Sequence, residues 1–402
     1  MSPAKRRGLR WVTNGPEPGP GNKPQHQAGW FEKHMNKATQ DMTRRSFLSA
    51  SAAALAGATA LSAGAETRHL ARNGAPLRVA MVGCGARGML LLAGLRALAA
   101  DGMAVRVIAA ADENPVQRQA AATLMGAASC ADWRDIAARN DVDAVVVALP
   151  DDLHAPAALA ALQSGKHVYL ETPAARSCSE SQLLARAARV TGAVVEVGAA
   201  ECALPAWRMA AELVREGRIG RVHWCHSVAA CSTRGGAVDW RGQRDRSQGL
   251  AAQLHHDQIM PLLQVLAPGS ATAATTAGGR WDALGNTPDS LISTVRFGDT
   301  LSINLVSSAL NTAGQRPILR GELGSLEVCV NGVMLTPEHG PEQWISVPAG
   351  IFTAEQLLLR DWVEAARGEH APLCPLSLGL AAQEAVDLSV AAYRNGQTTL
   401  QA

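Results

Sequence analysis

The sequence predicts an α/β domain with a doubly wound parallel sheet, followed by an α+β domain with an open, mostly antiparallel sheet. Across residues 77–198, short apolar runs alternate with helical patterns, which is typical of parallel strands covered by helices. Between residues 290 and 347, strand-like runs follow one another without intervening helices. A chain of 402 residues with 47% hydrophobic content can bury two such cores.

The first predicted domain, residues 77–198, contains five strands. Its apolar run Val145-Val-Val147 is expected of a parallel strand buried on both faces. Pro115 and Pro156 suit first helical turns, where a missing N–H costs nothing. The predicted strands cover residues 77–82, 104–110, 144–149, 168–171 and 193–197, and the predicted helices cover residues 89–100, 115–125, 155–164 and 180–190.

The second predicted domain covers residues 199–395. Its consecutive strands are separated by short turns that contain glycine, which indicates antiparallel pairing. The predicted helices cover residues 205–216, 250–266, 354–367 and 380–393, and the predicted strands cover residues 221–230, 290–297, 300–307, 317–320, 325–330 and 343–347.

The N-terminal segment has a different composition. Residues 1–41 are rich in Gly, Pro, Asn, Gln and Lys without periodicity, so we expect a leader that is disordered or untranslated. Thr43-Arg-Arg-Ser-Phe-Leu48 precedes a small, apolar run ending in Ala63-Gly-Ala65. This layout predicts a twin-arginine signal peptide over residues 42–65, whereas an amphipathic helix would need a polar face that the run lacks. We therefore expect the twin-arginine translocase as a partner, and a periplasmic or secreted location.

Charge and hydropathy exclude two classes of partner. Residues 1–65 hold nine Lys or Arg and three acidic residues, which gives this segment a net charge of +6. The whole chain has a net charge of +2, so residues 66–402 carry a net charge of −4. That part of the chain has no basic stripe, which argues against nucleic-acid binding. No uninterrupted apolar run reaches about 20 residues, so no stable membrane span is expected.

A glycine-rich turn follows the first predicted strand. Gly83, Gly85 and Gly88 form the pattern G-x-G-x-x-G between a strand and a helix, where backbone amides can receive a pyrophosphate. Asp112 ends the second strand, where a carboxylate can hold the adenosine ribose. A carboxylate there favours NAD over NADP, because a 2′-phosphate would meet negative charge.

This turn and the stretch ALPDDLHAPAALAALQSGKHVYLETP, from Ala148 to Pro173, resemble the Gfo/Idh/MocA family of NAD(P)-dependent oxidoreductases. The resemblance covers about residues 77–395. It implies a Rossmann domain, a second domain for substrate and oligomer contacts, and by analogy a homo-oligomer. The implied cofactor contacts, beyond the glycines and Asp112, are Arg87 at the phosphates, Leu149, Pro150 and His154 on the nicotinamide side, and Glu171 at the nicotinamide ribose; a packing role for His154 stays open.

The chain departs from the family at Thr172. Family members carry Glu-Lys-Pro, whose lysine contacts substrate, and this chain reads Glu171-Thr172-Pro173. Threonine offers one weak donor and no charge, so another group must exchange the proton. Relatives with a neutral residue here include exported NAD-dependent glycoside hydrolases, which oxidise the sugar transiently.

The segment Gln253-Leu-His-His-Asp-Gln258 resembles the family's second catalytic stretch, with Gln253 in place of an aspartate. His255 or His256 is predicted as the acid/base group, because imidazole titrates near neutral pH. Asp257 is expected to orient the imidazole or to hold a substrate hydroxyl. Adjacent helical residues point about 100° apart, so a metal site is not expected, and a structural histidine pair stays open.

The residues and the resemblance together predict an exported, NAD-dependent oxidoreductase that acts on a carbohydrate-like small molecule. Thr172 is expected beside the substrate. Arg241 is expected there too, because its loop is rich in arginine and suits sugar or carboxylate recognition, and a solvated loop charge stays open as its alternative role. A transient-redox glycoside hydrolase is the first alternative, although the chain has only two tyrosines for a cleft. A non-catalytic NAD-binding protein is the second.

Export should require the two guanidinium groups of Arg44 and Arg45. We expect the double variant Arg44→Lys/Arg45→Lys to leave the uncut precursor in the cytoplasm, because the receptor of this pathway reads the arginine pair. Immunoblots of cytoplasmic and periplasmic fractions measure this. Secretion that survives the double change and stops when the Sec channel is blocked would contradict it.

Overall fold

The computed structural model describes residues 75–232, 240–281, 285–312, 314, 317–348 and 350–401. The expected leader, residues 1–41, and the expected signal peptide, residues 42–65, lie outside this part of the chain. No helix within it has both the length and the apolar composition needed to cross a membrane.

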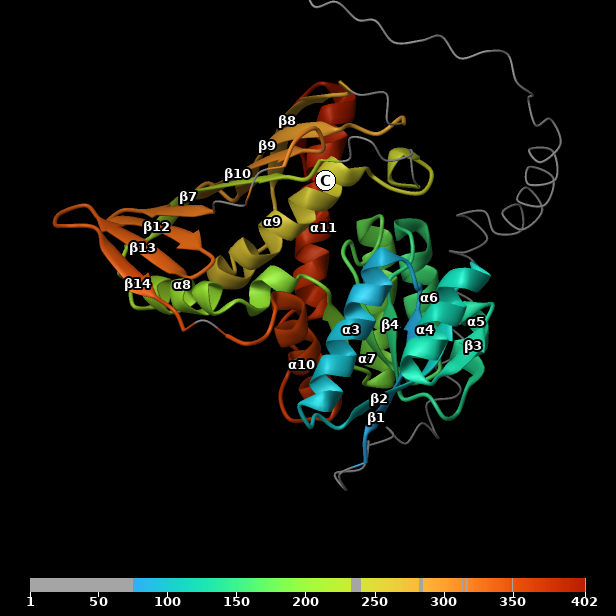
Figure 1. Ribbon diagram of the computed structural model, residues 1–402. Coiled ribbons are helices and arrows are strands. Elements are labelled where there is room, and N and C mark those ends of the chain that lie inside the picture. Colours follow the sequence, from blue (N-terminus) through green and yellow to red (C-terminus); the bar gives the residue numbers. More distant parts are fainter. Residues whose placement is uncertain are drawn as a thin grey trace, which may run out of the picture. The chain divides into compact units, whose positions relative to one another are not determined.

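The first domain is a six-stranded parallel sheet in the order β3-β2-β1-β4-β5-β6, with helices packed against it (Figure 1). The strand order reverses between β1 and β4, so their C-terminal ends open into the crevice where such sheets bind ligands. The strands are β1 Leu77–Val82, β2 Val105–Ala111, β3 Ala128–Cys130, β4 Ala144–Val147, β5 His167–Leu170 and β6 Val195–Val197, and the helices are α3 Ala86–Ala100, α4 Pro115–Met125, α5 Trp133–Ala138, α6 Asp151–Gln163 and α7 Cys178–Thr191.

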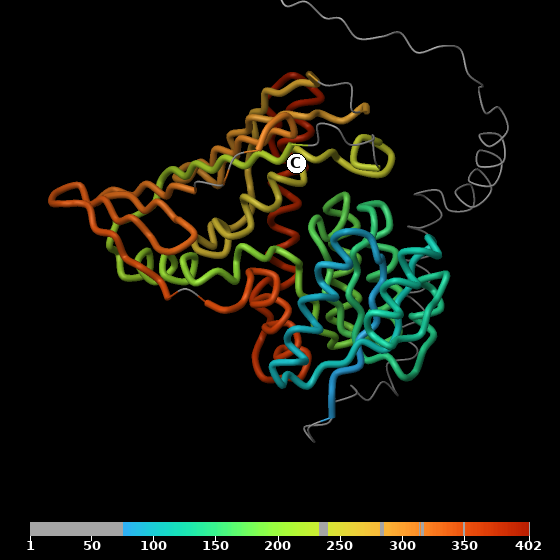
Figure 2. The backbone as a smooth tube through the Cα atoms, in the orientation of Figure 1, coloured from blue at the N-terminus to red at the C-terminus, as the bar shows by residue number. Residues whose placement is uncertain are grey.

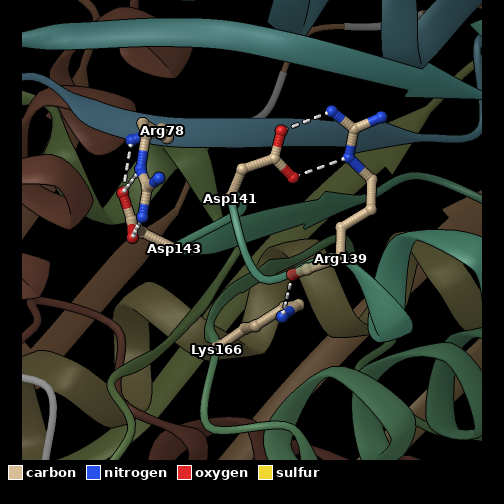
Figure 3. Close-up of polar contacts among 5 residues, drawn as sticks. All are labelled: Arg78, Arg139, Asp141, Asp143 and Lys166. Atoms are coloured by element: carbon tan, nitrogen blue, oxygen red, sulfur yellow. Dashed lines mark hydrogen bonds and ion pairs between the residues drawn. The ribbon is translucent and has the colours of Figure 1, made fainter. Parts of the chain in front are cut away.

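Polar contacts fasten the opposite, N-terminal edge of this sheet (Figure 3). Arg78 donates from Nη2 to Asp143 Oδ1 at 2.6 Å and from Nε to Oδ2 at 2.8 Å, which ties β1 to the start of β4. Arg139 pairs with Asp141 at 2.7 Å, and Lys166 Nζ donates to the Arg139 carbonyl at 2.8 Å. These contacts are structural and lie away from the crevice.

The second domain contains a nine-stranded sheet in the order β14-β13-β12-β11-β7-β10-β9-β8-β15. Every pairing is antiparallel except that of β7 with β10. Helices α8, α9 and α11 pack on one face of it (Figure 1). The strands are β7 Val222–Ala230, β8 Ala273–Gly279, β9 Ser290–Phe297, β10 Leu301–Ser308, β11 Ile318–Gly321, β12 Gly324–Cys329, β13 Gly332–Pro337, β14 Gln343–Ser346 and β15 Thr399–Leu400. The helices are η1 Ala200–Ala203, α8 Pro205–Arg215, η2 Trp240–Gly242, α9 Leu250–Leu266, α10 Ala354–Ala366 and α11 Leu376–Asn395.

The last part of the chain returns to the first domain. Figure 2 shows α10, drawn in red, beside α3, drawn in blue, and residues of the two helices are in contact. Gly94 makes the approach close, since a Cβ there would lie 2.9 Å from Leu359. Thr353 and Gln356 form a capping box that fixes where α10 begins. The predicted fold class is therefore confirmed, with the two sheets joined through α10 and α11.

A buried carboxyl supports this junction. Glu196 on β6 is fully buried, and its Oε1 accepts a hydrogen bond from the backbone N–H of Cys374 at 2.6 Å, just before α11. Burial, together with the negative charge of Asp361, raises the pKa of Glu196 to about 9. Glu196 is therefore protonated in the folded protein at neutral pH.

This carboxyl should make the protein less stable in alkali. The pKa of Glu196 returns to about 4.3 in the unfolded chain, so folding opposes its ionisation between roughly pH 5 and 9. The free energy of unfolding should fall across that window by up to about 1.4 kcal/mol per pH unit. Glu196→Gln should remove most of this fall, measured by urea unfolding at pH 5.5 and 8.5. An equal fall in both proteins would contradict the assignment.

Candidate functional site

The three glycines of the first turn have three different surroundings. Gly83 has a φ of 90°, and a Cβ there would lie 2.3 Å from the Ala148 carbonyl oxygen. A Cβ on Gly88 would lie 2.0 Å from the Gly83 carbonyl oxygen, so this glycine lets α3 pack against the turn. A Cβ on Gly85 would meet no heavy atom within 4 Å. Gly85 thus borders open space at the start of α3, where a pyrophosphate can approach the backbone.

Asp112 lies directly beside this turn, at the end of β2. Its Oδ2 accepts a hydrogen bond from the Cys84 N–H at 2.7 Å, and its Oδ1 accepts one from the Asn114 N–H at 2.8 Å. Both bonds hold the carboxylate at the mouth of the glycine turn, where the resemblance places the adenosine ribose. The geometry of the turn and of Asp112 therefore fits a dinucleotide.

Arg87 contacts two carboxylates. Its Nε donates to Glu171 Oε1 at 2.9 Å and its Nη1 donates to Glu355 Oε1 at 3.1 Å. The resemblance implies a phosphate contact for Arg87, and the structure instead shows a bridge from the glycine turn to the end of β5 and the first turn of α10. The predicted phosphate contact stays a prediction.

Glu171 follows the last residue of β5 and is almost completely buried. Burial raises its pKa to about 7, although the charge and hydrogen bond of Arg87 act in the opposite direction. The negative charge of Asp257 adds to the rise. Gly198 lies against it, because a Cβ there would come within 3.0 Å of the Glu171 carboxyl carbon. Glu171 is thus fixed at the crevice edge where a nicotinamide ribose would lie.

The loop after β4 is joined to the loop after β5 by His154. The Nε2 atom of its buried ring lies 2.7 Å from the Leu149 carbonyl oxygen, and Nδ1 lies 2.7 Å from the Pro173 carbonyl oxygen. Burial lowers the pKa of His154. Pro150 precedes α6 as its N-cap residue. Of the two roles left open for His154, these contacts favour positioning of the two loops.

Thr172 is held by two side chains from α9. Its hydroxyl donates to Asp257 Oδ1 at 2.9 Å, and its carbonyl oxygen accepts a hydrogen bond from Gln253 Nε2 at 3.1 Å. Gln253 and Asp257 are four residues apart, so they lie on the same face of the helix. Burial raises the pKa of Asp257, although the Thr172 hydrogen bond and the charge of Arg87 lower it. This contact brings a partly buried carboxyl from the second domain to the end of β5.

His255 lies on a different face of α9. Its Nδ1 is 2.6 Å from Ser307 Oγ and its Nε2 is 2.9 Å from Ser293 Oγ, both on strands of the large sheet. Burial and the neighbouring His256 lower the pKa of His255 to about 3, so the ring is neutral. The structure therefore places this predicted acid/base group in the sheet core and does not bring it to Thr172.

His256 is also buried and neutral. Burial lowers its pKa to about 4, and the charge of Asp387 on α11 only partly offsets this. Its Nε2 is buried with no hydrogen-bond partner among the described residues. The charge that acts on His256 comes from Asp387 on α11, whereas Asp257 accepts a hydrogen bond from the Thr172 hydroxyl. The geometry therefore favours Asp257, not His256, as the titratable group beside Thr172.

Arg241 reaches the same site through Gln253. Its Nε donates to Gln253 Oε1 at 3.1 Å, and its guanidinium carbon lies 4.1 Å from the centroid of the Trp240 ring. Gln253 thus connects Arg241 to the Thr172 carbonyl. The structure therefore brings together Arg241, Thr172 and Asp257 and leaves His255 and His256 aside. The substrate role of Thr172 and Arg241 stays a prediction.

Sequence reasoning missed other acidic groups near the crevice. Glu201 on η1 has a pKa raised by burial and by the charges of Asp257 and Glu355. Asp151, directly after Pro150, is buried, and its pKa is raised by burial to about 7. Asp151 lies inside the quoted family stretch, so its sequence position could have indicated it. Nothing in the local sequence marks Glu201.

Comparison with known proteins connects this geometry to a cofactor class. Residues 77–199 match the GFO_IDH_MocA oxidoreductase family, described as having an NAD-binding Rossmann fold. The chain is 36% identical over 113 residues to levoglucosan dehydrogenase of Pseudarthrobacter phenanthrenivorans, covering 28% of this chain and 29% of that protein. It is 27% identical over 196 residues to 2,7-anhydro-N-acetylneuraminate hydratase of Mediterraneibacter gnavus, covering 47% and 52%. The chain spans about half the length of the first curated relatives it matches.

Solved structures share the fold over more of the chain. Levoglucosan dehydrogenase in complex with NADH and L-sorbose superimposes with a TM-score of 0.74 at 19% identity, covering 81% of this chain and 99% of that one. A dehydrogenase from Bordetella pertussis in complex with NADH and UDP-GlcNAcA gives a TM-score of 0.69 at 20% identity, covering 81% and 99%. Both sheets are therefore arranged as in known dehydrogenases.

Asp112 should set the choice of cofactor. Asp112→Ala should weaken NAD binding by about 1–3 kcal/mol, the scale of a lost charge-assisted hydrogen bond. It should also reduce the preference of the protein for NAD over NADP. Calorimetric titration of both nucleotides into both proteins measures this. Tighter binding of NADP than of NAD by the unmodified protein would contradict it.

Proposed function

We propose that this chain is an NAD-dependent oxidoreductase that acts on a sugar, polyol or related polyhydroxylated compound. Its residues 77–199 match the NAD-binding Rossmann domain of the Gfo/Idh/MocA oxidoreductase family. The observation that carries the proposal is the partly buried Asp257 carboxyl, held 2.9 Å from the Thr172 hydroxyl at the end of β5. The relative named levoglucosan dehydrogenase supports a sugar-like substrate. The twin-arginine pattern of residues 42–65 supports export as part of the same proposal.

The chain's own residues would hold the cofactor in a defined order. Backbone amides at Gly85 and the start of α3 would bind the pyrophosphate, and Asp112 the adenosine ribose. Glu171 would bind the nicotinamide ribose. The bound nicotinamide supplies a site that accepts or releases hydride. The negative charge of Asp112 supports NAD over NADP.

Asp257 would move the proton that accompanies hydride transfer. During oxidation of a substrate alcohol, its carboxylate takes the hydroxyl proton, and during reduction its carboxylic acid returns it. Burial raises the pKa of Asp257, which makes the carboxylate a better base than an exposed aspartate. The Thr172 hydroxyl donates to Oδ1 and so orients the carboxyl group.

A second candidate is redox-assisted elimination or hydration, in which transient oxidation of a sugar hydroxyl acidifies a neighbouring C–H bond. The relative named as a hydratase favours it, as does the neutral side chain of Thr172. The proton steps would again use Asp257. Release of a leaving group, or uptake of water, without net consumption of NAD would distinguish this reaction from simple dehydrogenation.

Asp257→Asn tests the proposed function. We expect kcat for oxidation to fall about 10²–10⁴-fold, because the amide cannot accept the proton, while NADH binding stays unchanged. In the unmodified protein the oxidation rate should rise with pH as the Asp257 carboxyl ionises, and this rise should disappear in the variant. Native mass spectrometry for bound NAD(H), followed by absorbance at 340 nm against a panel of sugars and polyols, provides the assay.

His256→Gln is the discriminating variant in the same assay, with thermal unfolding as the check on its fold. A large loss in His256→Gln with little loss in Asp257→Asn would return the acid/base role to the histidine. If no member of the panel changes the absorbance of bound NAD(H), the oxidoreductase proposal fails in favour of a non-catalytic NAD-binding protein.

A further inference from the structure

Arg87 joins three separate elements at the cofactor crevice. It is the second residue of α3, at the helix start where a pyrophosphate is expected. Its Nε donates to Glu171 Oε1 at 2.9 Å, directly after β5, and its Nη1 donates to Glu355 Oε1 at 3.1 Å, in the first turn of α10. Glu171 and Glu355 therefore share one guanidinium, although Glu171 belongs to the Rossmann domain and Glu355 to the last part of the chain.

The position of Glu355 is fixed by the packing of its helix. A capping box holds the first turn of α10, in which Glu355 lies. Further along the same helix, Arg360 Nη2 donates to Asp101 Oδ2 at 2.7 Å, at the C-terminal end of α3. Polar contacts at both ends of α3 therefore hold α10 beside it. The pairing of Glu355 with Arg87 follows from the way in which these two helices dock.

The charges that act on Glu171 come from several elements. Burial raises the pKa of Glu171 to about 7, the charge and hydrogen bond of Arg87 on α3 oppose this rise, and the charge of Asp257 on α9 adds to it. Tyr169 on β5 keeps its proton, since burial and the charge of Glu171 raise its pKa. Burial and the charge of Asp257 also raise the pKa of Glu201 on η1. Near neutral pH, the ionisation of Glu171 is therefore sensitive to the charge that Arg87 brings to it.

Glu355 reduces the effect of that charge. Burial raises the pKa of Glu355, but its backbone hydrogen bond and then the hydrogen bond and charge of Arg87 outweigh burial, so the pKa lies below its usual value. Glu355 is thus ionised at neutral pH, and its negative charge offsets part of the positive charge that Arg87 offers to Glu171. Ionised Glu171 is the form that accepts hydrogen bonds from both hydroxyls of a ribose. Glu355 therefore opposes the form of Glu171 that suits the cofactor.

We propose that Glu355 is a positioning residue for cofactor binding: by sharing Arg87 with Glu171, it sets how strongly the Glu171 carboxyl group binds the nicotinamide ribose. The docking of α10 on α3 thereby links the last part of the chain to the affinity of the Rossmann domain for NAD(H). This inference rests on the cofactor of the proposed function and on the predicted contact of Glu171 with the ribose, and it does not depend on the substrate.

Cofactor binding at two pH values tests the inference without a substrate. NADH fluorescence titration of the unmodified protein should give a Kd about 10-fold lower at pH 8 than at pH 6, because the ribose favours the ionised form of a carboxyl whose pKa is about 7. Glu355→Gln should tighten binding at pH 6 and reduce this difference to about 2–4-fold, since Arg87 then acts on Glu171 alone. Glu364→Gln is the matched control, because it removes a carboxylate from the same helix, where Glu364 pairs with His370, and it should leave the difference unchanged.

Arg87→Gln shows whether Glu355 acts through the arginine. This change alone should move the rise in affinity to higher pH, because Glu171 loses the cation that favours its ionised form, so the titrations extend to pH 9. In the Arg87→Gln background, the further change Glu355→Gln should leave the pH dependence nearly unaltered, as expected when one residue acts through the other. Thermal unfolding at each pH confirms that every variant is folded.

The outcomes separate this inference from the proposed function. The same pH dependence in Glu355→Gln as in the unmodified protein, or an equal change in Glu364→Gln, overturns the inference and leaves the oxidoreductase standing. A uniform change of affinity at both pH values also overturns it, because loss of packing alone would give that result. The expected change, with no sugar or polyol altering the absorbance at 340 nm, supports the inference and counts against the oxidoreductase. No binding of NADH by the unmodified protein overturns both.

Discussion

The contact between Thr172 and one face of α9 is the constraint on which the rest of the site depends. Asp257 accepts from the Thr172 hydroxyl, and Gln253 donates to its carbonyl. Two consecutive turns of a helix from the second domain are thereby fixed to the end of a parallel strand of the first. Gln253 in turn holds Arg241, so the position of its guanidinium follows from the same contact.

The electrostatics of the crevice follow from burial of several carboxyls around one arginine. Arg87 bonds Glu171 and Glu355, and the charge of Asp257 affects the ionisation of Glu171 and of Glu201. Removal from water raises the pKa of Glu171, Asp257 and Glu201, and for Glu171 and Glu201 neighbouring negative charges add to the rise. The ionisation of Glu171 therefore depends on Arg87, whose charge and hydrogen bond oppose the rise in its pKa.

The long, strongly patterned elements could be predicted from the sequence, and the short or weakly patterned ones could not. The predicted bounds of β1, α4, α9 and β9 match the structure at both ends. The short β3 and α5 were not predicted because three and six residues give no readable period, and β8, rich in Ala, Thr and Gly, lacks clear alternation. In the site, the glycine turn and Asp112 follow from residue type and spacing. The orientation of the α9 side chains required the packing of the helix against β5 and the large sheet.

The histidines show how burial changes the proton-transfer chemistry that residue type alone suggests. Imidazole titrates near neutral pH in water, but His255 is enclosed by serines of the sheet, and burial lowers its pKa to about 3. Burial acts in the opposite sense on a carboxyl. The pKa of Asp257 therefore rises toward neutral pH, whereas the pKa of the histidine falls away from neutral pH. Helical geometry gives the same answer independently: a face that contains Gln253 also contains Asp257, whereas residues 255 and 256 point about 160° and 100° away from Asp257. Under the proposed function, then, the side chain with the less suitable solution pKa is the one that the fold places beside Thr172 and whose pKa the fold raises.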